Sequence, residues 1–193
     1  ANTHTETTVS GTAMTKAYHK AKHIIKEHVN SNDDDVLICC GSGMTEAINK
    51  FQRILGLKVP ENMRKHTQVP DVMKPVVFIT NMEHISIQTK WLETIEKVDF
   101  FQPGEDGLFC MENFKTLLEQ YKDRPIKIAS VVGGSNVTGI QTPYHNIAKV
   151  MHQNGGVCFV DFACSAPYVD IDMHPEDEEQ ALDAIFFSPH KFI

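Results

Sequence analysis

The stretch KIASVVGGSNVTGIQTPYHNIAKVMHQNGGVCFVDF, residues 127–162, decides the fold class. It begins and ends with apolar runs of strand length, Lys127–Gly133 and Val157–Phe162. Between them lies Tyr144–Gln153, whose apolar residues recur at helical spacing. A strand, a helix and a second apolar strand in this order are typical of a parallel sheet that helices cover on both faces.

The same alternation continues on both sides of this stretch. The other predicted strands are Val36–Cys40, Val76–Thr80, Val98–Gln102 and Ala184–Ser188. The other predicted helices are Met14–Val29, a helix after Gly41–Gly43, Ile87–Lys97 and Glu112–Tyr121. We therefore predict an α/β fold: a doubly wound, mostly parallel sheet of six strands with helices on both faces. The first dozen residues are polar and are expected to form an N-terminal arm.

Composition excludes several classes of protein. Of the 193 residues, 41% are hydrophobic and 22% are charged, which is typical of a globular chain and excludes collagen, coiled coils and wholesale disorder. A net charge of −7 without a basic stripe disfavours a nucleic-acid partner, and no apolar run approaches the roughly 18 residues of a membrane helix. Five cysteines without a CxxC motif favour reduced thiols in a cytoplasmic protein. His19 and His23 have no third ligand at a fixed spacing, so no metal site is expected.

Chemically active side chains follow the predicted strands. In doubly wound sheets, ligands bind at the carboxyl ends of the strands. The residues at these ends are Gly41–Thr45, Asn81–His84, Gly133–Asn136, Asp161–Cys164 and Ser188–Lys191.

Each of these groups suggests a chemistry, with a structural alternative beside it. A glycine turn into a helix, as at Gly41–Gly43, can bind an anion through backbone N–H groups, or it can be a simple connection capped by Thr45. Asp161 follows a buried strand, and a buried carboxylate requires a cationic partner. Lys191 can be an exposed side chain or, in an apolar pocket, an amine nucleophile.

Together these groups are the parts that a pyridoxal phosphate site needs: a phosphate anchor, a lysine for a Schiff base and an acid beside the pyridine nitrogen. The motifs that carry them are Gly-Met-Thr-Glu-Ala-Ile-Asn (43–49), Glu83-His84, Asn136-Val-Thr-Gly139, Val160-Asp161-Phe-Ala163 and Ser188-Pro-His-Lys191. In their order and spacing, over nearly the whole chain, they resemble the class V aminotransferase family, in the branch of cysteine desulfurases and selenocysteine lyases.

The resemblance implies a role for each site residue. Lys191 would form the Schiff base and move protons at the substrate Cα and at C4′, Asp161 would pair with the pyridine nitrogen, and His84 would stack on the ring. These three are the implied catalytic residues. Cofactor binding would also involve Asn136, near the phenolic oxygen or the substrate carboxylate, together with Gly43 and Cys164. Met44 through its backbone, Thr45, Ser188 and His190 would hold the phosphate.

Two positions depart from the family pattern, and so does the length. Cys164 stands where many relatives have a glutamine that contacts the phenolic oxygen, and Met44 stands where some desulfurases have threonine. Family members are much longer than this chain. The resemblance therefore implies that residues 1–193 are a partial, incomplete fold-type I large domain, with residues 1–12 as an arm and without the small C-terminal domain. Such a piece, lacking its closing strand, is expected to be poorly stable alone.

The implied function is a pyridoxal-phosphate-dependent reaction on an amino acid, with C–S cleavage as in cysteine desulfurases as the first expectation. The enzyme would be a cytoplasmic homodimer, without nucleic-acid or membrane partners, that hands sulfur to an acceptor protein. Aminotransferase and kynureninase-like reactions share the motifs and stay open. Two further alternatives are an inactive piece and a nucleotide-binding module in which Gly41–Gly43 holds phosphate and Glu83 binds a ribose.

Overall fold

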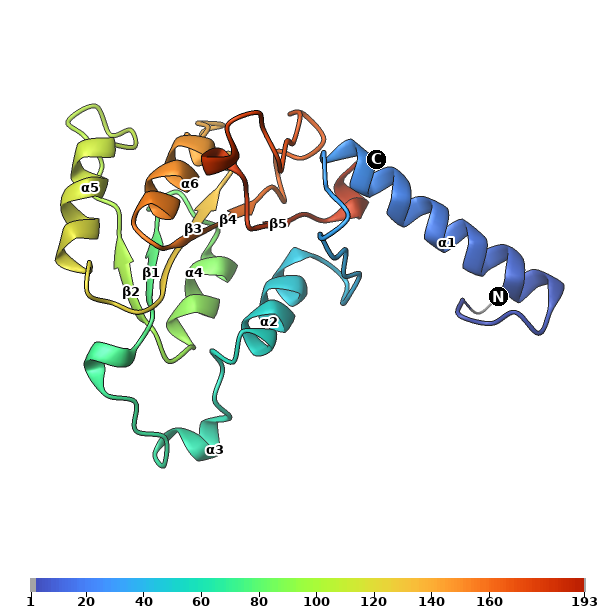
Figure 1. Cartoon of the computed structure of the whole chain (residues 1–193), viewed down its shortest axis with the longest axis horizontal. Coiled ribbons are helices and arrows are strands. Elements are labelled where there is room, and N and C mark those ends of the chain that lie inside the picture. The colour runs from blue at the N-terminus through green and yellow to red at the C-terminus, as the bar shows by residue number, and fades with distance from the viewer. Residues whose placement is uncertain (1–2, 193) are drawn as a thin grey trace.

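The computed structural model describes residues 3–192 and contains a five-stranded sheet (Figure 1). The strands are β1 (Val76–Ile79), β2 (Lys97–Phe100), β3 (Lys127–Val132), β4 (Val157–Asp161) and β5 (Ala184–Phe186). Their order is β2-β1-β3-β4-β5, and every neighbouring pair is parallel. All five carboxyl ends therefore lie at the same edge of the sheet.

Helices cover both faces of this sheet, so the predicted doubly wound α/β class is confirmed (Figure 1). The helices α5 (Met111–Gln120) and α6 (Tyr144–Gln153) pack on one face, and α2 (Met44–Ile54) and α4 (Ile85–Leu92) pack on the other. The remaining helical elements are α1 (Val9–His28), α3 (Glu61–Arg64) and the 3-10 turns η1 (Asp71–Met73), η2 (Glu178–Gln180) and η3 (Pro189–Lys191).

Alternate side chains of β1 pack against the helices on opposite faces of the sheet. Phe78 points to the α5 layer and meets the rings of Phe114 and Tyr121 at centroid distances of 6.1 and 5.7 Å. Its neighbour Ile79 belongs to the other cluster, together with Trp91 of α4. Because successive side chains of a strand point to opposite faces, a fully apolar strand is buried only when both faces are covered.

The predicted strand Val36–Cys40 is wrong. The segment is extended but belongs to no sheet among the described residues, and β5 pairs only with β4 there. Val36 is 80% exposed and Ile38 49% exposed, so the segment is not buried on both faces as the other apolar runs are. A strand needs a neighbouring backbone to satisfy its N–H and C=O groups, and a cavity separates this segment from the edge of β5.

The helix predicted at Met14–Val29 begins five residues earlier, at Val9, within the segment expected as an arm. It starts where the Thr8 hydroxyl accepts a hydrogen bond from the Gly11 N–H, and it projects away from the sheet (Figure 1). Ile24, in the second half of this helix, is 53% exposed. No helix in the part of the chain that the structure describes is long and apolar enough to cross a membrane.

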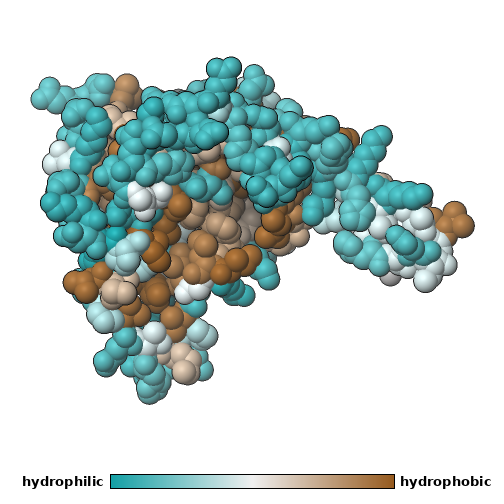
Figure 2. Space-filling model, in the orientation of Figure 1, coloured by the Kyte–Doolittle hydropathy of each residue, from teal (hydrophilic) through white to brown (hydrophobic). Residues whose placement is uncertain are grey.

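The apolar side chains of α2 are only partly buried. Ile48 is 1% exposed, but Ile54 and Leu55 at the other end of the helix are 55% and 41% exposed. Figure 2 shows apolar surface on this side of the molecule, between the sheet and α3. Exposed hydrophobic side chains of the neighbouring segments are Met63, Val72, Met73 and Leu92.

Candidate active site

A cavity of about 330 Å³ lies at the carboxyl edge of the sheet. All ten residues predicted to bind the cofactor line it, although they come from five separate segments of the chain. The lining residues are Ser42, Gly43, Met44, Thr45, Glu46, His84, Ser86, Val132, Asn136, Asp161, Ala163, Cys164, Ser188, His190 and Lys191.

The N-terminus of α2 forms one wall of the cavity. The Met44 N–H donates a hydrogen bond of 3.0 Å to the buried Ser188 hydroxyl, which ties α2 to the turn that carries Lys191. A Cβ at Gly43 would lie 3.4 Å from the His190 ring and 3.5 Å from the Ser188 hydroxyl oxygen, so glycine keeps this corner open. Backbone N–H groups and hydroxyls at a helix N-terminus form a setting that favours an anion.

A chain of hydrogen bonds joins the starts of α2 and α4. The His84 Nδ1 accepts a hydrogen bond from the Ser86 N–H at 3.2 Å and lies 2.8 Å from the Ser86 hydroxyl. That hydroxyl lies 3.3 Å from the hydroxyl of Thr45, so Thr45 contacts Ser86 and does not cap α2. Because Nδ1 accepts from a backbone N–H, a neutral His84 ring carries its proton on Nε2.

Asp161 is the buried acid of the site, at the end of β4 and only 4% exposed. Its Oδ1 accepts a hydrogen bond of 2.7 Å from the Ala163 N–H. Burial raises the pKa of Asp161 to about 6, although that hydrogen bond and the charges of Lys191 and His84 act to lower it. The group is therefore poised to ionise when a cation enters the cavity.

Lys191 and Cys164 lie beside this carboxyl. Lys191 ends the turn η3, and its side chain is exposed at the cavity mouth. The thiol of Cys164 donates to the Gly134 carbonyl oxygen at 2.8 Å. Burial and the charge of Asp161 raise the pKa of Cys164, so the group is a neutral thiol and serves as a weak donor. Asn136 is exposed at the rim.

Glu83 does not line the cavity, which removes the ribose-binding acid that the nucleotide-binding alternative required. Its carboxyl accepts hydrogen bonds from the Thr80 hydroxyl and the Val132 N–H instead. Sequence reasoning also missed Ser86 as part of the site. Its position in the sequence could have indicated it. Ser86 is two residues after His84, and the N-cap side chain of a helix accepts a hydrogen bond from a backbone N–H at about this position.

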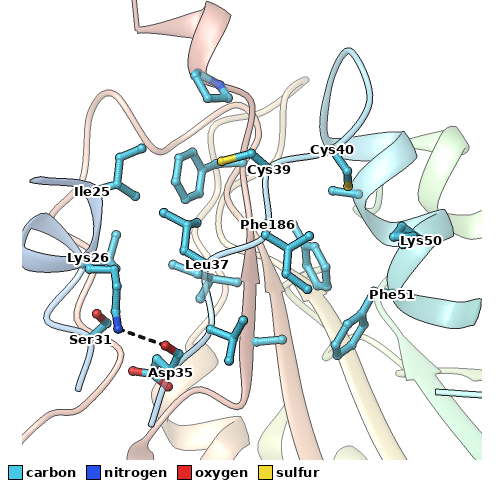
Figure 3. Close-up of a pocket in the computed structure, with 18 of the residues that line it drawn as sticks. Ile25, Lys26, Ser31, Asp35, Leu37, Cys39, Cys40, Lys50, Phe51 and Phe186 are labelled. Atoms are coloured by element: carbon cyan, nitrogen blue, oxygen red, sulfur yellow. Dashed lines mark hydrogen bonds between the residues drawn. The ribbon is translucent and has the colours of Figure 1, made fainter. Parts of the chain in front are cut away.

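A larger cavity of about 610 Å³ lies between α1, the segment 34–43, α2 and β5 (Figure 3). Figure 3 shows Leu37, Phe51 and Phe186 on its walls, and Lys26 donating to the backbone oxygen of Asp35 at 2.9 Å. Its walls are mostly apolar, and they do not unite a buried carboxyl, an imidazole and a helix N-terminus as the smaller cavity does. The smaller cavity is therefore the candidate active site.

Three buried carboxyls, two of them at or beside the site, predict how the free energy of unfolding depends on pH. Burial raises the pKa of Glu83 to about 8, of Glu96 to about 8 and of Asp161 to about 6. Because the folded chain binds these protons more tightly than the unfolded chain, the free energy of unfolding should fall as pH rises from about 5 toward about 8.

Urea unfolding of the cofactor-free protein at several pH values measures this dependence. The double variant Glu83→Gln, Glu96→Gln serves as the comparison, because it removes two of the three titrations. Its stability relative to wild type should increase with pH over the same range. A difference that stays constant with pH would contradict the raised pKa values.

Comparison with known proteins identifies the family. The model of the class V aminotransferase family matches residues 1–193, the whole chain. The chain therefore belongs to this family, whose members depend on pyridoxal phosphate.

Among the relatives, a probable cysteine desulfurase from Halalkalibacterium halodurans is 28% identical over 98% of this chain and 43% of its own length. A cysteine desulfurase from Haloferax volcanii is 33% identical over 60% of this chain and 26% of its own. The structure of a cysteine desulfurase from Thermococcus onnurineus superposes with a TM-score of 0.75 at 17% identity, covering 100% of this chain and 43% of that one. The chain thus spans less than half the length of these relatives.

Proposed function

We propose that the whole protein is a pyridoxal-phosphate-dependent enzyme that cleaves the C–S bond of an amino acid, as a cysteine desulfurase does, and that Lys191 holds the cofactor as a Schiff base. The observation that carries this proposal is that one cavity unites a helix N-terminus, a buried acid, an imidazole and an amine. The similarity to proteins named cysteine desulfurases supports the choice of reaction within the family.

The residues present fit three groups of the cofactor: its phosphate, its ring nitrogen and its aldehyde. The corner formed by Gly43, the Met44 N–H, Thr45, Ser188 and His190 suits a phosphate, because its donors surround a helix N-terminus. Among residues 3–192, the carboxyl of Asp161 has no cationic partner within hydrogen-bond distance, and a protonated ring nitrogen would supply one. Bound pyridoxal phosphate supplies an aldehyde for the lysine and a ring that accepts electrons from the substrate Cα.

The chain's own groups then have distinct tasks. Lys191 would hold the aldehyde of the cofactor through its amine, and the same amine would take up and return the proton at the substrate Cα. Asp161 would keep the ring nitrogen protonated, and the His84 ring would stack on the cofactor. Asn136 and the Cys164 thiol would face the phenolic oxygen, the thiol in place of the side-chain amide that many relatives have there.

Incubation of the purified whole protein with pyridoxal phosphate, cysteine and an excess of a thiol reductant tests the reaction. The sulfur leaves cysteine as zero-valent sulfur and the thiol reduces it, so the proposal expects sulfide and alanine in equal amounts. Keto acid and transferred amino groups without sulfide would instead favour an aminotransferase, and cleavage of kynurenine would favour a kynureninase-like enzyme. Binding of a nucleotide without any of these reactions would contradict the proposal.

We further propose that residues 1–193 form the cofactor-binding part of the enzyme, with residues 1–12 as an arm of the large domain. The relatives' greater length supports this division. The enzyme in this proposal is a homodimer that passes sulfur to an acceptor protein, a step that would follow the desulfurase reaction. The five free cysteines of the chain accord with a reducing compartment such as the cytoplasm.

Two substitutions at His84 should separate its stacking on the cofactor from its capping of α4. Asn can still accept the Ser86 N–H bond that caps α4, but it has no ring, whereas Phe keeps a ring and loses the acceptor. We expect His84→Asn to weaken cofactor binding roughly two- to tenfold, from about 0.5–1.5 kcal/mol of lost stacking. We expect His84→Phe to retain binding and to lose about 1 kcal/mol of stability.

Cofactor titration measures the first effect and urea unfolding of the cofactor-free protein measures the second. Equal weakening of cofactor binding by the two variants would contradict the stacking role.

A further inference from the structure

Glu83 is a second buried carboxyl beside the site, and the roles proposed above do not use it. It lies between the end of β1 and the start of α4, directly before His84. Its Oε1 accepts a hydrogen bond of 2.7 Å from the Thr80 hydroxyl and one of 2.8 Å from the Val132 N–H. Thr80 follows β1 and Val132 ends β3, so a single oxygen atom bridges the carboxyl ends of two neighbouring strands.

The other oxygen of this carboxyl indicates its protonation state. Oε2 is buried and has no hydrogen-bond partner among the described residues. Burial raises the pKa of Glu83 to about 8, against the effect of its two hydrogen bonds, and the charge of Asp161 raises it further. At neutral pH the group is therefore a neutral acid whose Oε1 acts as the acceptor.

The bridge constrains the residue that follows it. His84 is the N-cap of α4, and its ring is already held at Nδ1 by the Ser86 N–H. With the Glu83 side chain fixed to two strand ends, the backbone that enters His84 is fixed as well. Val132, whose N–H forms half of the bridge, itself lines the cavity.

We propose that Glu83 is a positioning residue: by accepting two hydrogen bonds on one oxygen, it fixes the loop 80–84 and thereby the plane of the His84 ring against the bound cofactor. This inference rests on the proposed function, because it concerns the same cofactor. An imidazole that is already held in place loses less conformational freedom when the cofactor binds. Removing the hydrogen bonds of Glu83 should therefore weaken cofactor binding and let the bound cofactor ring move more freely.

Three variants of the whole protein test this role. Glu83→Gln keeps a neutral side chain with an acceptor oxygen, so it should bind pyridoxal phosphate within about twofold of wild type. Glu83→Met removes the acceptor and leaves the Thr80 hydroxyl and the Val132 N–H unpaired, so binding should weaken at least about tenfold. Thr80→Val removes one of the two bonds and should give an intermediate effect, which decides the matter if Glu83→Met does not fold.

Glu96 provides the matched control. It also has a buried carboxyl with a pKa raised to about 8, but it lies at the amino end of β2, at the opposite edge of the sheet. Glu96→Met should therefore leave cofactor binding unchanged, whatever it does to stability.

The readouts are the dissociation constant of pyridoxal phosphate and the circular dichroism of the bound cofactor, which reports how firmly the protein orients the ring. The proposal expects both to change in Glu83→Met and Thr80→Val, and both to be preserved in Glu83→Gln and Glu96→Met. Wild-type values in all four variants would overturn the positioning role alone. Failure of the wild-type protein to bind the cofactor would overturn the proposed function, and the positioning role with it.

Discussion

Substitution of Lys191 by alanine should abolish the covalent attachment of pyridoxal phosphate and lower the rate of cysteine cleavage by more than about 10³-fold. Among the described residues, Lys191 is the one lysine that lines the cavity, so no other amine there can take over. In the proposed function Lys191 both bonds to the cofactor and moves protons. Its loss therefore impairs two steps at once, and the loss of rate is not a sum of separate contributions. Borohydride reduction followed by intact mass measures the attachment, and sulfide release in the presence of a thiol reductant measures the rate.

Two further variants show whether the loss of activity in Lys191→Ala is due to the loss of its amine. Lys191→Arg keeps a positive charge near Asp161 but cannot form the bond, so it should be as inactive as the alanine variant. Lys122→Ala removes an exposed lysine that pairs with Glu119 at 2.7 Å on the surface, so it should behave as wild type. Substantial activity in Lys191→Arg would show that only charge matters at this position.

Substitution of Asp161 by asparagine should lower the reaction rate by about 10²–10³-fold, while the protein stays folded. Asparagine has nearly the same shape and can still accept the hydrogen bond from the Ala163 N–H. What it lacks is the negative charge that keeps a ring nitrogen protonated inside a buried site, where such an interaction is far stronger than in water.

Asp99→Asn is the matched control for this substitution. Asp99 lies on β2 and accepts a hydrogen bond of 2.6 Å from the Tyr121 hydroxyl, and it does not line the cavity. Its variant should keep the wild-type rate. If Asp161→Asn also retained that rate at a pH where wild-type Asp161 is ionised, the buried acid would not be the partner of the cofactor.

Much of the fold could be predicted because its strands are buried on both faces. Such strands appear in the sequence as short apolar runs, and Val76–Thr80 and Val157–Phe162 match β1 and β4 within one residue. The helix Tyr144–Gln153 was predicted at its true bounds, since its apolar residues Ile147, Ala148 and Met151 all face the sheet. Parallel strands then bring their carboxyl ends to one edge, which is why the predicted site residues meet in one cavity.

Other features depend on partners that a local pattern does not reveal. Val36–Cys40 has strand-like composition, but a strand exists only where another backbone pairs with it. The bridge made by Glu83 depends on the N–H of Val132, 49 residues further along the chain. In the sequence, Glu83 stands out as an acid at a strand end and as part of the Glu83-His84 motif. Its orientation away from the cavity follows from contacts between segments.

One measurement tests the central proposal most directly: reduction of the protein–pyridoxal phosphate complex with borohydride, digestion, and mass-spectrometric mapping of the modified lysine. The proposed function predicts a single phosphopyridoxyl group on Lys191 in wild type, and none on the corresponding peptide of Lys191→Ala. Modification of a different lysine, or no modification under conditions in which the cofactor binds, would contradict it.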